Sequence, residues 1–250
     1  METQNSTVVN RSDLKINGSG NTSGGNFNDV IINGAGEIKG DVDCVNFKSN
    51  GTTSMSGNLI SKTVKVNGTA SVKGNMKSDD IKINGSADIS GSVESDITRI
   101  HGSVNINGNI SSEELQLRGG MRVSGDCNAE KFESSGGFSV LGLLNAGNIS
   151  IKLQAPCKAK EIGGENICVR KGNDFALKKL INTLFPSWDL SKKLTADLIE
   201  GNNIELESTR AKIVRGDNIT IGDDCEIDLV EYRKSYNHSD KSTLKENKKV

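Results

Sequence analysis

Glycine recurs at a fixed interval between residues 34 and 142 of this chain. Seven glycines, from Gly34 to Gly136, stand 17 residues apart without a break, and each is followed six residues later by a second glycine. An internal repeat of this length indicates a fold made of stacked, similar units, so it constrains the architecture more than any single motif. The two series are Gly34, Gly51, Gly68, Gly85, Gly102, Gly119 and Gly136, and Gly40, Gly57, Gly74, Gly91, Gly108, Gly125 and Gly142.

The apolar residues keep the same phase as the glycines. They recur four, eight, thirteen and fifteen residues after the first glycine of a repeat, and in the repeat that starts at Gly68 they are Val72, Met76, Ile81 and Ile83. Side chains two residues apart lie on one face of a strand, so each repeat is expected to contain three short strands. We therefore predict closed rungs of 17 residues with their apolar side chains inside.

A column of small residues lies ten positions after each first glycine. We expect this column to mark a tight part of the interior, where serine hydroxyls bond to the backbone of a turn. The alternative is that these are plain surface serines. The column consists of Cys44, Ser61, Ser78, Ser95, Ser112, Ala129 and Ala146.

The recurrent sequence I-x-I-N-G marks a corner of each rung. It appears as LKING at 14–18, VKVNG at 64–68 and IKING at 81–85. Asn and Gly tolerate positive φ better than other residues, so we predict a sharp turn with positive φ here. His101 occupies the asparagine position of its rung, and we interpret it as a corner residue rather than a catalytic base.

A single rung would leave its strands unpaired and its apolar side chains in water. Stacking similar rungs along one axis satisfies both requirements. The sequence therefore predicts an all-β fold, a parallel β-helix that forms a solenoid with three short strands per 17-residue rung. At one rung per strand spacing, roughly ten or eleven rungs would be about 50 Å long.

The 17-residue phase ends after residue 152, but a related pattern continues. The segments 162–169, 199–206 and 214–221 share an apolar residue, a glycine, an asparagine and alternating apolar residues, which predicts further rungs interrupted by an insertion. We expect a disordered tail at 1–12, rungs at 13–170, the insertion at 171–193, further rungs at 194–232 and a disordered basic tail at 233–250.

The insertion contains apolar residues at helical spacing, which predicts a short amphipathic helix. Two interpretations stay open: the helix packs against the solenoid, or it docks on a membrane surface or a partner. The candidate docking residues are Phe175, Leu177, Leu180, Ile181, Leu184, Phe185 and Trp188.

Composition and charge argue against several function classes. Basic residues number 31 and acidic residues 32, so the formal net charge of −1 gives no overall attraction for nucleic acid. The chain starts without a leader pattern and has no apolar run long enough to span a bilayer, so we expect a soluble, cytoplasmic protein. The five cysteines include no CxxC pair, which favours reduced, buried thiols over a disulfide framework or a zinc site.

Comparison with the motifs of enzymes and ligand-binding solenoids gives no match. The chain lacks a GxSxG motif, a P-loop and a calcium-binding nonapeptide. The outward positions three, five and seven residues after each first glycine form no repeated acidic column of the kind that polysaccharide lyases use. We predict that the protein is not an enzyme and has no catalytic residue, cofactor or metal site.

Each end of a parallel solenoid exposes an open strand edge above a ring of apolar side chains. Such edges pair with another chain unless a cap covers them. The short polar segment before Leu14 is a weak cap, so we expect self-association end to end. The candidate contact residues are Leu14, Ile16, Phe27 and Ile32 at one end and Ile219, Ile221, Ile227 and Val230 at the other.

The rungs VKVNG-x3-VKGNM and IKING-x3-ISGSV, with the late segment VRGDNITIGDDCEIDLVEY, resemble bactofilins, the polymer-forming cytoskeletal proteins of bacteria. The resemblance spans residues 14–232. It implies a right-handed β-helix that assembles without nucleotide into nonpolar filaments, often at the inner membrane surface. It also implies a scaffolding role in the envelope, cell shape or motility, with client proteins and a paralogous subunit as partners.

Two features depart from the family pattern. The insertion is followed by extra rungs, and the start METQNSTVVN is too polar for the membrane-targeting stretch that some bactofilins carry. The insertion is therefore the better candidate for a peripheral membrane contact. The main alternative function is a β-helical binding module that does not polymerise and recognises a protein or polysaccharide partner through a flat face.

Overall fold

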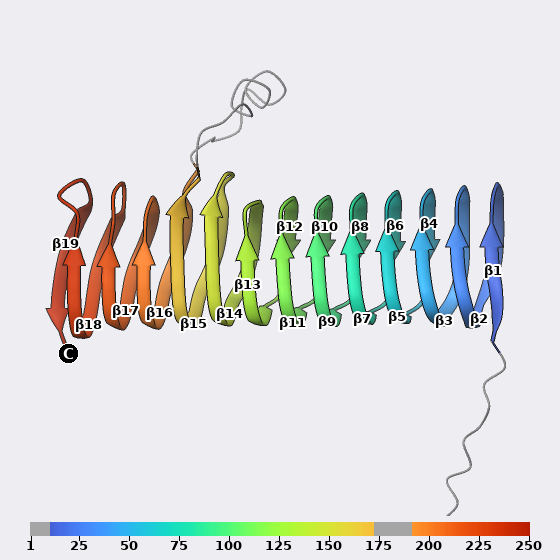
Figure 1. Ribbon diagram of the computed structural model, residues 1–250, viewed down its shortest axis with the longest axis horizontal. Helices are drawn as coiled ribbons and strands as arrows, with labels where there is room; N and C mark the ends of the chain where they lie inside the picture. Colours follow the sequence, from blue (N-terminus) through green and yellow to red (C-terminus); the bar gives the residue numbers. More distant parts are fainter. Residues whose placement is uncertain (1–10, 173–191) are drawn as a thin grey trace, which may run out of the picture.

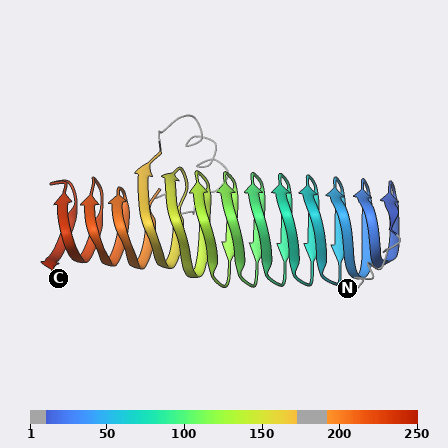
Figure 2. The same cartoon turned by 60° about the horizontal axis from the view of Figure 1, so that its bottom comes forward.

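The computed structural model describes residues 11–172 and 192–250 of the protein. Within these residues the chain forms an all-β solenoid of about 13 turns that contains no helix. Figure 1 shows the strands side by side in chain order, from blue at the N-terminal end to red at the C-terminal end, and Figure 2 shows the same row after a 60° rotation. The predicted parallel β-helix is confirmed.

The described residues form 19 strands. They are β1 (Ser12–Ile16), β2 (Ser19–Ile32), β3 (Ala35–Ser49), β4 (Thr52–Met55), β5 (Leu59–Val66), β6 (Thr69–Val72), β7 (Met76–Ile83), β8 (Ser86–Ile89), β9 (Val93–Ile100), β10 (Ser103–Ile106), β11 (Ile110–Leu117), β12 (Gly120–Val123), β13 (Cys127–Ser134), β14 (Gly137–Leu153), β15 (Cys157–Lys171), β16 (Leu194–Leu206), β17 (Thr209–Ile221), β18 (Glu226–His238) and β19 (Thr243–Lys249).

Neighbouring rungs pair in parallel and in a register that follows the sequence repeat. Val66 of β5 pairs with Ile83 of β7, which is 17 residues later. Equivalent residues of successive rungs therefore form columns parallel to the long axis. The longer step from Val169 to its partner Leu206 spans the insertion, so β15 and β16 are adjacent in the stack. Residues 173–191, which contain all seven candidate docking residues, lie outside the described part of the chain.

The C-terminal segment differs from the sequence-based expectation. Strand β18 continues to His238 and β19 runs from Thr243 to Lys249, so the prediction of a disordered tail at 233–250 is wrong. The apolar pattern of this segment is weak because the last rung has a neighbour on one side only. Tyr236 and Leu244 contact the rung beneath, pairing with Ile219 and Ile227. The solenoid consequently has about 13 turns rather than roughly ten or eleven.

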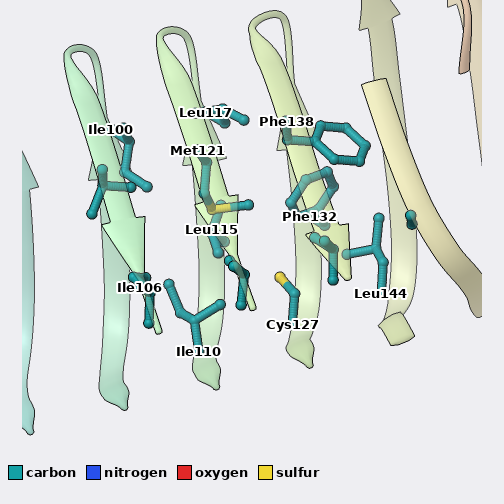
Figure 3. Packing of buried hydrophobic residues seen from close by; sticks show 14 of the residues in the cluster. Ile100, Ile106, Ile110, Leu115, Leu117, Met121, Cys127, Phe132, Phe138 and Leu144 are labelled. Atoms are coloured by element: carbon teal, nitrogen blue, oxygen red, sulfur yellow. The ribbon is translucent and has the colours of Figure 1, made fainter. Parts of the chain in front are cut away.

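The core is a continuous stack of apolar side chains inside the solenoid. Figure 3 shows this packing over neighbouring rungs, with Phe132 and Phe138 in contact. The two rings lie edge to face, with centroids 5.5 Å apart and an interplanar angle of 83°. Because each buried residue packs against equivalents above and below, many small layers replace one bulky centre.

The column of small residues lies in this interior, as predicted. Ser78 is only 4% exposed, and its hydroxyl donates to the carbonyl oxygens of Lys62 at 3.0 Å and Asp80 at 3.2 Å. Ser61 and Ser112 are buried and bond to backbone carbonyls in the same way. The alternative of plain surface serines is therefore rejected.

The glycine corners have a different cause from the one predicted. Among the described residues positive φ occurs at Gly25, Gly40, Ser208 and Asp224, and not at the I-x-I-N-G corners. The prediction of positive φ there is wrong. A Cβ on Gly68 would instead lie well within 3.0 Å of the carbonyl oxygen of Gly51 in the preceding rung. Glycine is needed because two stacked corners approach each other too closely for any side chain.

Candidate functional site at the two ends of the solenoid

At the N-terminal end of the described solenoid, β1 pairs with β2 along one edge. Leu14, Ile16 and Phe27 are only partly buried and pack against the core, as expected for the residues of a terminal ring. Ile32 is fully buried because it lies between Ile16 and Ser49 of the neighbouring rungs. Leu14 and Ile16 therefore lie in the terminal strand, whereas Phe27 and Ile32 lie in the second rung, where Phe27 keeps part of its surface exposed.

Arg11 fastens this end across two rungs, which the sequence analysis did not predict. Its Nη1 donates to the carbonyl oxygens of Phe27 and Asp43, each at 3.0 Å. Its Nη2 bonds to Oδ1 of Asp43 at 2.8 Å. The guanidinium thus ties the start of β1 to the second and third rungs and fixes the position of the terminal ring.

The four residues predicted at the C-terminal end lie one rung inside it. Ile219, Ile221, Ile227 and Val230 are at most 2% exposed, because the end of β18 and β19 cover them. Their placement in the terminal ring is wrong for the same reason as the disordered tail: residues 235–249 add a further rung.

The apolar residues of the actual C-terminal end are Tyr232, Tyr236 and Leu244, which are partly buried against the core. The rings of Tyr232 and Tyr236 stack with centroids 5.2 Å apart, and His238 stacks on Tyr236 at 5.5 Å. The hydroxyl of Tyr236 is buried without a hydrogen-bond partner in the described structure, and burial raises the pKa of this phenol. Aromatic residues with a polar tip are common at interfaces, so this ring suits contact with another chain.

A ladder of asparagine side chains runs along one corner from the N-terminal end. Each Nδ2 donates to the Oδ1 of the preceding rung at 2.8 Å. His101 continues the ladder with Nδ1 3.3 Å from Oδ1 of Asn84, which can only accept, so Nδ1 carries the proton. The structure thus places His101 at a corner, as predicted, in a structural hydrogen bond. The ladder consists of Asn17, Asn33, Asn50, Asn67, Asn84 and His101.

Four of the five cysteines are buried in the core, which lowers the reactivity of their thiols. Burial raises the pKa of Cys127 and of Cys157 to about 12, and Cys225 to a pKa of about 11. Cys168 is half-buried, and all five thiols are free. Across residues 11–172 and 192–250, no group of three or more His, Cys, Asp or Glu side chains could hold a metal ion.

A broad groove on the lateral surface lies over the rungs of β3, β5, β7 and β9. It is open to solvent, has a volume of about 680 Å³, and is lined by Val42, Leu59, Ile60 and Lys77 among others. Ile60 is 51% exposed. No helix in the described part of the chain is long and apolar enough to cross a membrane.

Comparison with known proteins agrees with this architecture. The family model described as "Bactofilin: Polymer-forming cytoskeletal" matches residues 3–94 and 52–145, which together exceed half of the chain. YhbE of Bacillus subtilis (strain 168), described as an uncharacterized protein, is 61% identical over 226 residues, covering 89% of this chain and 92% of its own length. YhbF of the same strain, also described as uncharacterized, is 35% identical over 109 residues, covering 43% of this chain and 42% of its own.

No solved structure matches the chain. The family match nevertheless spans the region where the 17-residue columns are most regular, and the similarity to YhbE extends over both sides of the insertion. The chain therefore belongs to the bactofilin family of polymer-forming cytoskeletal proteins.

Proposed function

We propose that this protein is the subunit of a filament that assembles end to end without nucleotide and acts as a cytoplasmic scaffold. The observation that carries the proposal is the form of the two ends. Each terminal strand, β1 and β19, has a described partner on one side only, beside partly buried apolar residues. A second subunit stacked there would pair with the open strand edge and cover those residues.

Burial of these residues can supply the free energy of assembly. Leu14, Ile16 and Phe27 at one end, and Tyr236 and Leu244 at the other, still expose part of their apolar surface. Complete burial of a large apolar side chain contributes about 1.5–3 kcal/mol, of which the partly buried ones gain a fraction. Several such residues per junction, together with backbone hydrogen bonds, contribute to the free energy of about 8 kcal/mol that micromolar assembly requires.

The test places one charge at each end and one on the side. We expect Ile16→Asp and Leu244→Asp to abolish filaments in negative-stain electron microscopy and in high-speed sedimentation, without nucleotide or metal. Ile60→Asp is the matched control, since it makes the same kind of change at an exposed position on the lateral surface. Discrete particles of the wild-type protein at every concentration would contradict the proposal, as would filaments of both end variants.

The alternative function is a binding module that does not polymerise. The open groove beside Ile60 supports it, because an exposed apolar residue in a groove lined largely by apolar atoms is a usual feature of a recognition site. The same variants separate the two functions. Loss of partner binding in Ile60→Asp, with no filaments in any variant, would favour the binding module that recognises a protein or polysaccharide.

The cellular role follows from the family rather than from the geometry. We propose a scaffold for envelope, shape or motility proteins, at the inner face of the membrane. The two distinct relatives in one Bacillus subtilis strain support a paralogous subunit as a second partner. The insertion residues Phe175 to Trp188 remain the proposed docking segment. Sedimentation of wild-type filaments with and without vesicles, against a variant lacking residues 173–191, tests the membrane contact.

A further inference from the structure

Charged side chains are arranged differently in the two halves of the solenoid. In the C-terminal half the columns alternate in sign from rung to rung. Lys212 pairs with Asp197 at 2.8 Å, and Glu231 lies between Arg215 at 2.6 Å and Lys248 at 2.7 Å. Opposite charges in neighbouring strands stabilise a sheet, so this half satisfies its charges internally.

The N-terminal half instead contains a column of like charges, the acidic stripe: Asp79, Asp96, Glu113 and Glu130. The register on either side of Asp79, with Ser78 paired to Ser95 and Asp80 to Ile97, places Asp79 beside Asp96, and the following rungs repeat this. All four side chains are exposed. None has an ion-pair partner within 4.0 Å among residues 11–172 and 192–250.

A second column, the basic stripe, consists of Lys48, Lys65, Lys82 and Arg99, which pair in register in successive rungs. Arg99 contacts Asp80 at 3.1 Å. The three lysines make no ion pair with any described residue. Like charges in adjacent strands, about 4.8 Å apart, repel each other, so both stripes are unfavourable in an isolated subunit.

The positions three, five and seven residues after the first glycine of each repeat form no acidic column. The acidic stripe lies eleven residues after this glycine, in the repeats that start at Gly68, Gly85, Gly102 and Gly119. A groove of about 380 Å³ runs beside this stripe, lined by its four carboxylates and by the small side chains Ser78, Ser95, Ser112 and Ala129. A hollow lined with carboxylates and small residues can accept long basic side chains.

The two stripes match each other in repeat and in length. Each carries one charge per rung over four rungs, because both are columns of the same solenoid. An unrelated basic or acidic partner would need the same spacing by chance, whereas a second copy of this chain has it by construction. Charge complementarity therefore identifies a second copy as the partner that fits both stripes.

We propose that filaments of this protein associate side by side, with the acidic stripe of one subunit against the basic stripe of a subunit in the next filament. This inference rests on the proposed function. A few exposed ion pairs contribute little between two single subunits, but a filament repeats the contact at every subunit and holds all of them at once. Salt screens exposed charges, so the association weakens as ionic strength rises.

The experiment uses two reversed variants of the full-length chain and one control. Lys65→Glu/Lys82→Glu reverses the two central charges of the basic stripe, and Asp96→Lys/Glu113→Lys reverses the two central charges of the acidic stripe. Each altered stripe then repels its wild-type partner at its centre but matches the altered stripe of the other variant. The control Lys39→Glu/Lys73→Glu causes the same change in net charge as the first variant at exposed positions outside both stripes. Low-speed sedimentation and electron microscopy measure bundles, and high-speed sedimentation measures total filament.

We expect wild-type and control proteins to form bundles at low salt that separate into single filaments at high salt. Each reversed variant should form single filaments only, with bundling reduced at least tenfold, and an equimolar mixture of the two should bundle again. Failure of the mixture to bundle, or bundling of either variant alone, would overturn the inference.

Two further outcomes would also overturn it, and they differ from failure of the proposed function. Single wild-type filaments at every salt concentration would leave end-to-end assembly intact and remove lateral pairing. In the second outcome, the wild-type protein binds to vesicles of anionic lipid, Lys65→Glu/Lys82→Glu does not, and Asp96→Lys/Glu113→Lys still forms bundles. The partner of the basic stripe would then be a membrane. If no filaments form at any salt concentration, the stripe contact can still be tested by mixing the two reversed variants in analytical ultracentrifugation. If the mixture then forms no hetero-oligomers, the stripe contact itself is rejected.

Discussion

Gly119 and Gly120 give a matched test of why the solenoid needs glycine at its corners. A Cβ on Gly119 would lie well within 3.0 Å of the carbonyl oxygen of Gly102 in the preceding rung, and 2.7 Å from that of His101. A Cβ on Gly120 would meet nothing closer than Oγ of Ser103, at 3.8 Å. Since neither glycine has positive φ, replacement by alanine changes only the space that each rung requires.

The loss of stability in Gly119→Ala can be estimated from the atoms that must move to make room for the added methyl group. An alanine at position 119 can be accommodated only if the carbonyl of Gly102 shifts, and this oxygen accepts a hydrogen bond from the backbone N of Gly120 at 2.8 Å. Overpacking costs about 1–3 kcal/mol, and loss of the hydrogen bond adds about 0.5–1.5 kcal/mol. We expect Gly119→Ala to destabilise the fold by about 2–4 kcal/mol, and Gly120→Ala to stabilise it by about 0.4–1 kcal/mol through reduced entropy of the unfolded chain.

Thermal unfolding followed by circular dichroism measures the difference. For a chain of this size, a loss of about 3 kcal/mol lowers Tm by about 6–12 °C. Both alanine variants should be made in the Ile16→Asp background and compared at equal concentration, because assembly would otherwise contribute to Tm. If Gly119→Ala melts within about 2 °C of Gly120→Ala, close approach between stacked corners is not the reason for glycine.

Three further predictions concern the core and the C-terminal rungs. Iodoacetamide at pH 8 should label half-buried Cys168 well before Cys127, whose pKa burial raises to about 12, and mass spectrometry of the native protein would show the order. Tyr236→Phe removes a buried hydroxyl without a partner, so Tm should stay constant or rise, and a loss above about 1 kcal/mol would contradict this. Lys248 holds the pKa of Glu231 below its usual range. The stability that this pair contributes is therefore complete above the ordinary glutamate pKa of about 4.3, and it is lost as pH falls through the lower pKa of the folded state. Hydrogen exchange in acid should show the last rungs opening first.

The repeat made the fold predictable, because a column is visible in the sequence as residues 17 apart. The inward position of Ile81 and the burial of Ser78 both follow from that phase. The sequence did not predict the last rung because the apolar pattern of this rung is weak. The rung has a neighbour on one side only, and its apolar residues in contact with the core are Tyr236 and Leu244. The φ values at the corners could not be read from the sequence, since glycine serves equally for a left-handed turn and for close packing.

The charged columns were predictable in principle and were missed for a physical reason. The motif comparison looked at positions that alternate along a strand face, whereas the acidic stripe, from Asp79 to Glu130, lies where this alternation breaks. Asp79 and Asp80 both lie outside the core, between buried Ser78 and buried Ile81. An alignment of the rungs in 17-residue register shows both stripes at once. Net charge hides them, since equal numbers of opposite charges in separate columns cancel in the sum.

The residues that break the repeat define where the stack ends. The column of small residues carries an aromatic ring at Phe27 and at Tyr232, and each lies one rung from an end, paired on its outer side with Ser12 or Lys249. Further inside, a rung on both sides leaves room only for a residue such as Gly216. A large aromatic ring fits in this column only next to a terminal rung, because no further rung of the same chain covers its neighbour on that side. End-to-end contacts between subunits should therefore be sought among the exceptions to the repeat, because an apolar residue that obeys it is already buried by the rungs of its own chain.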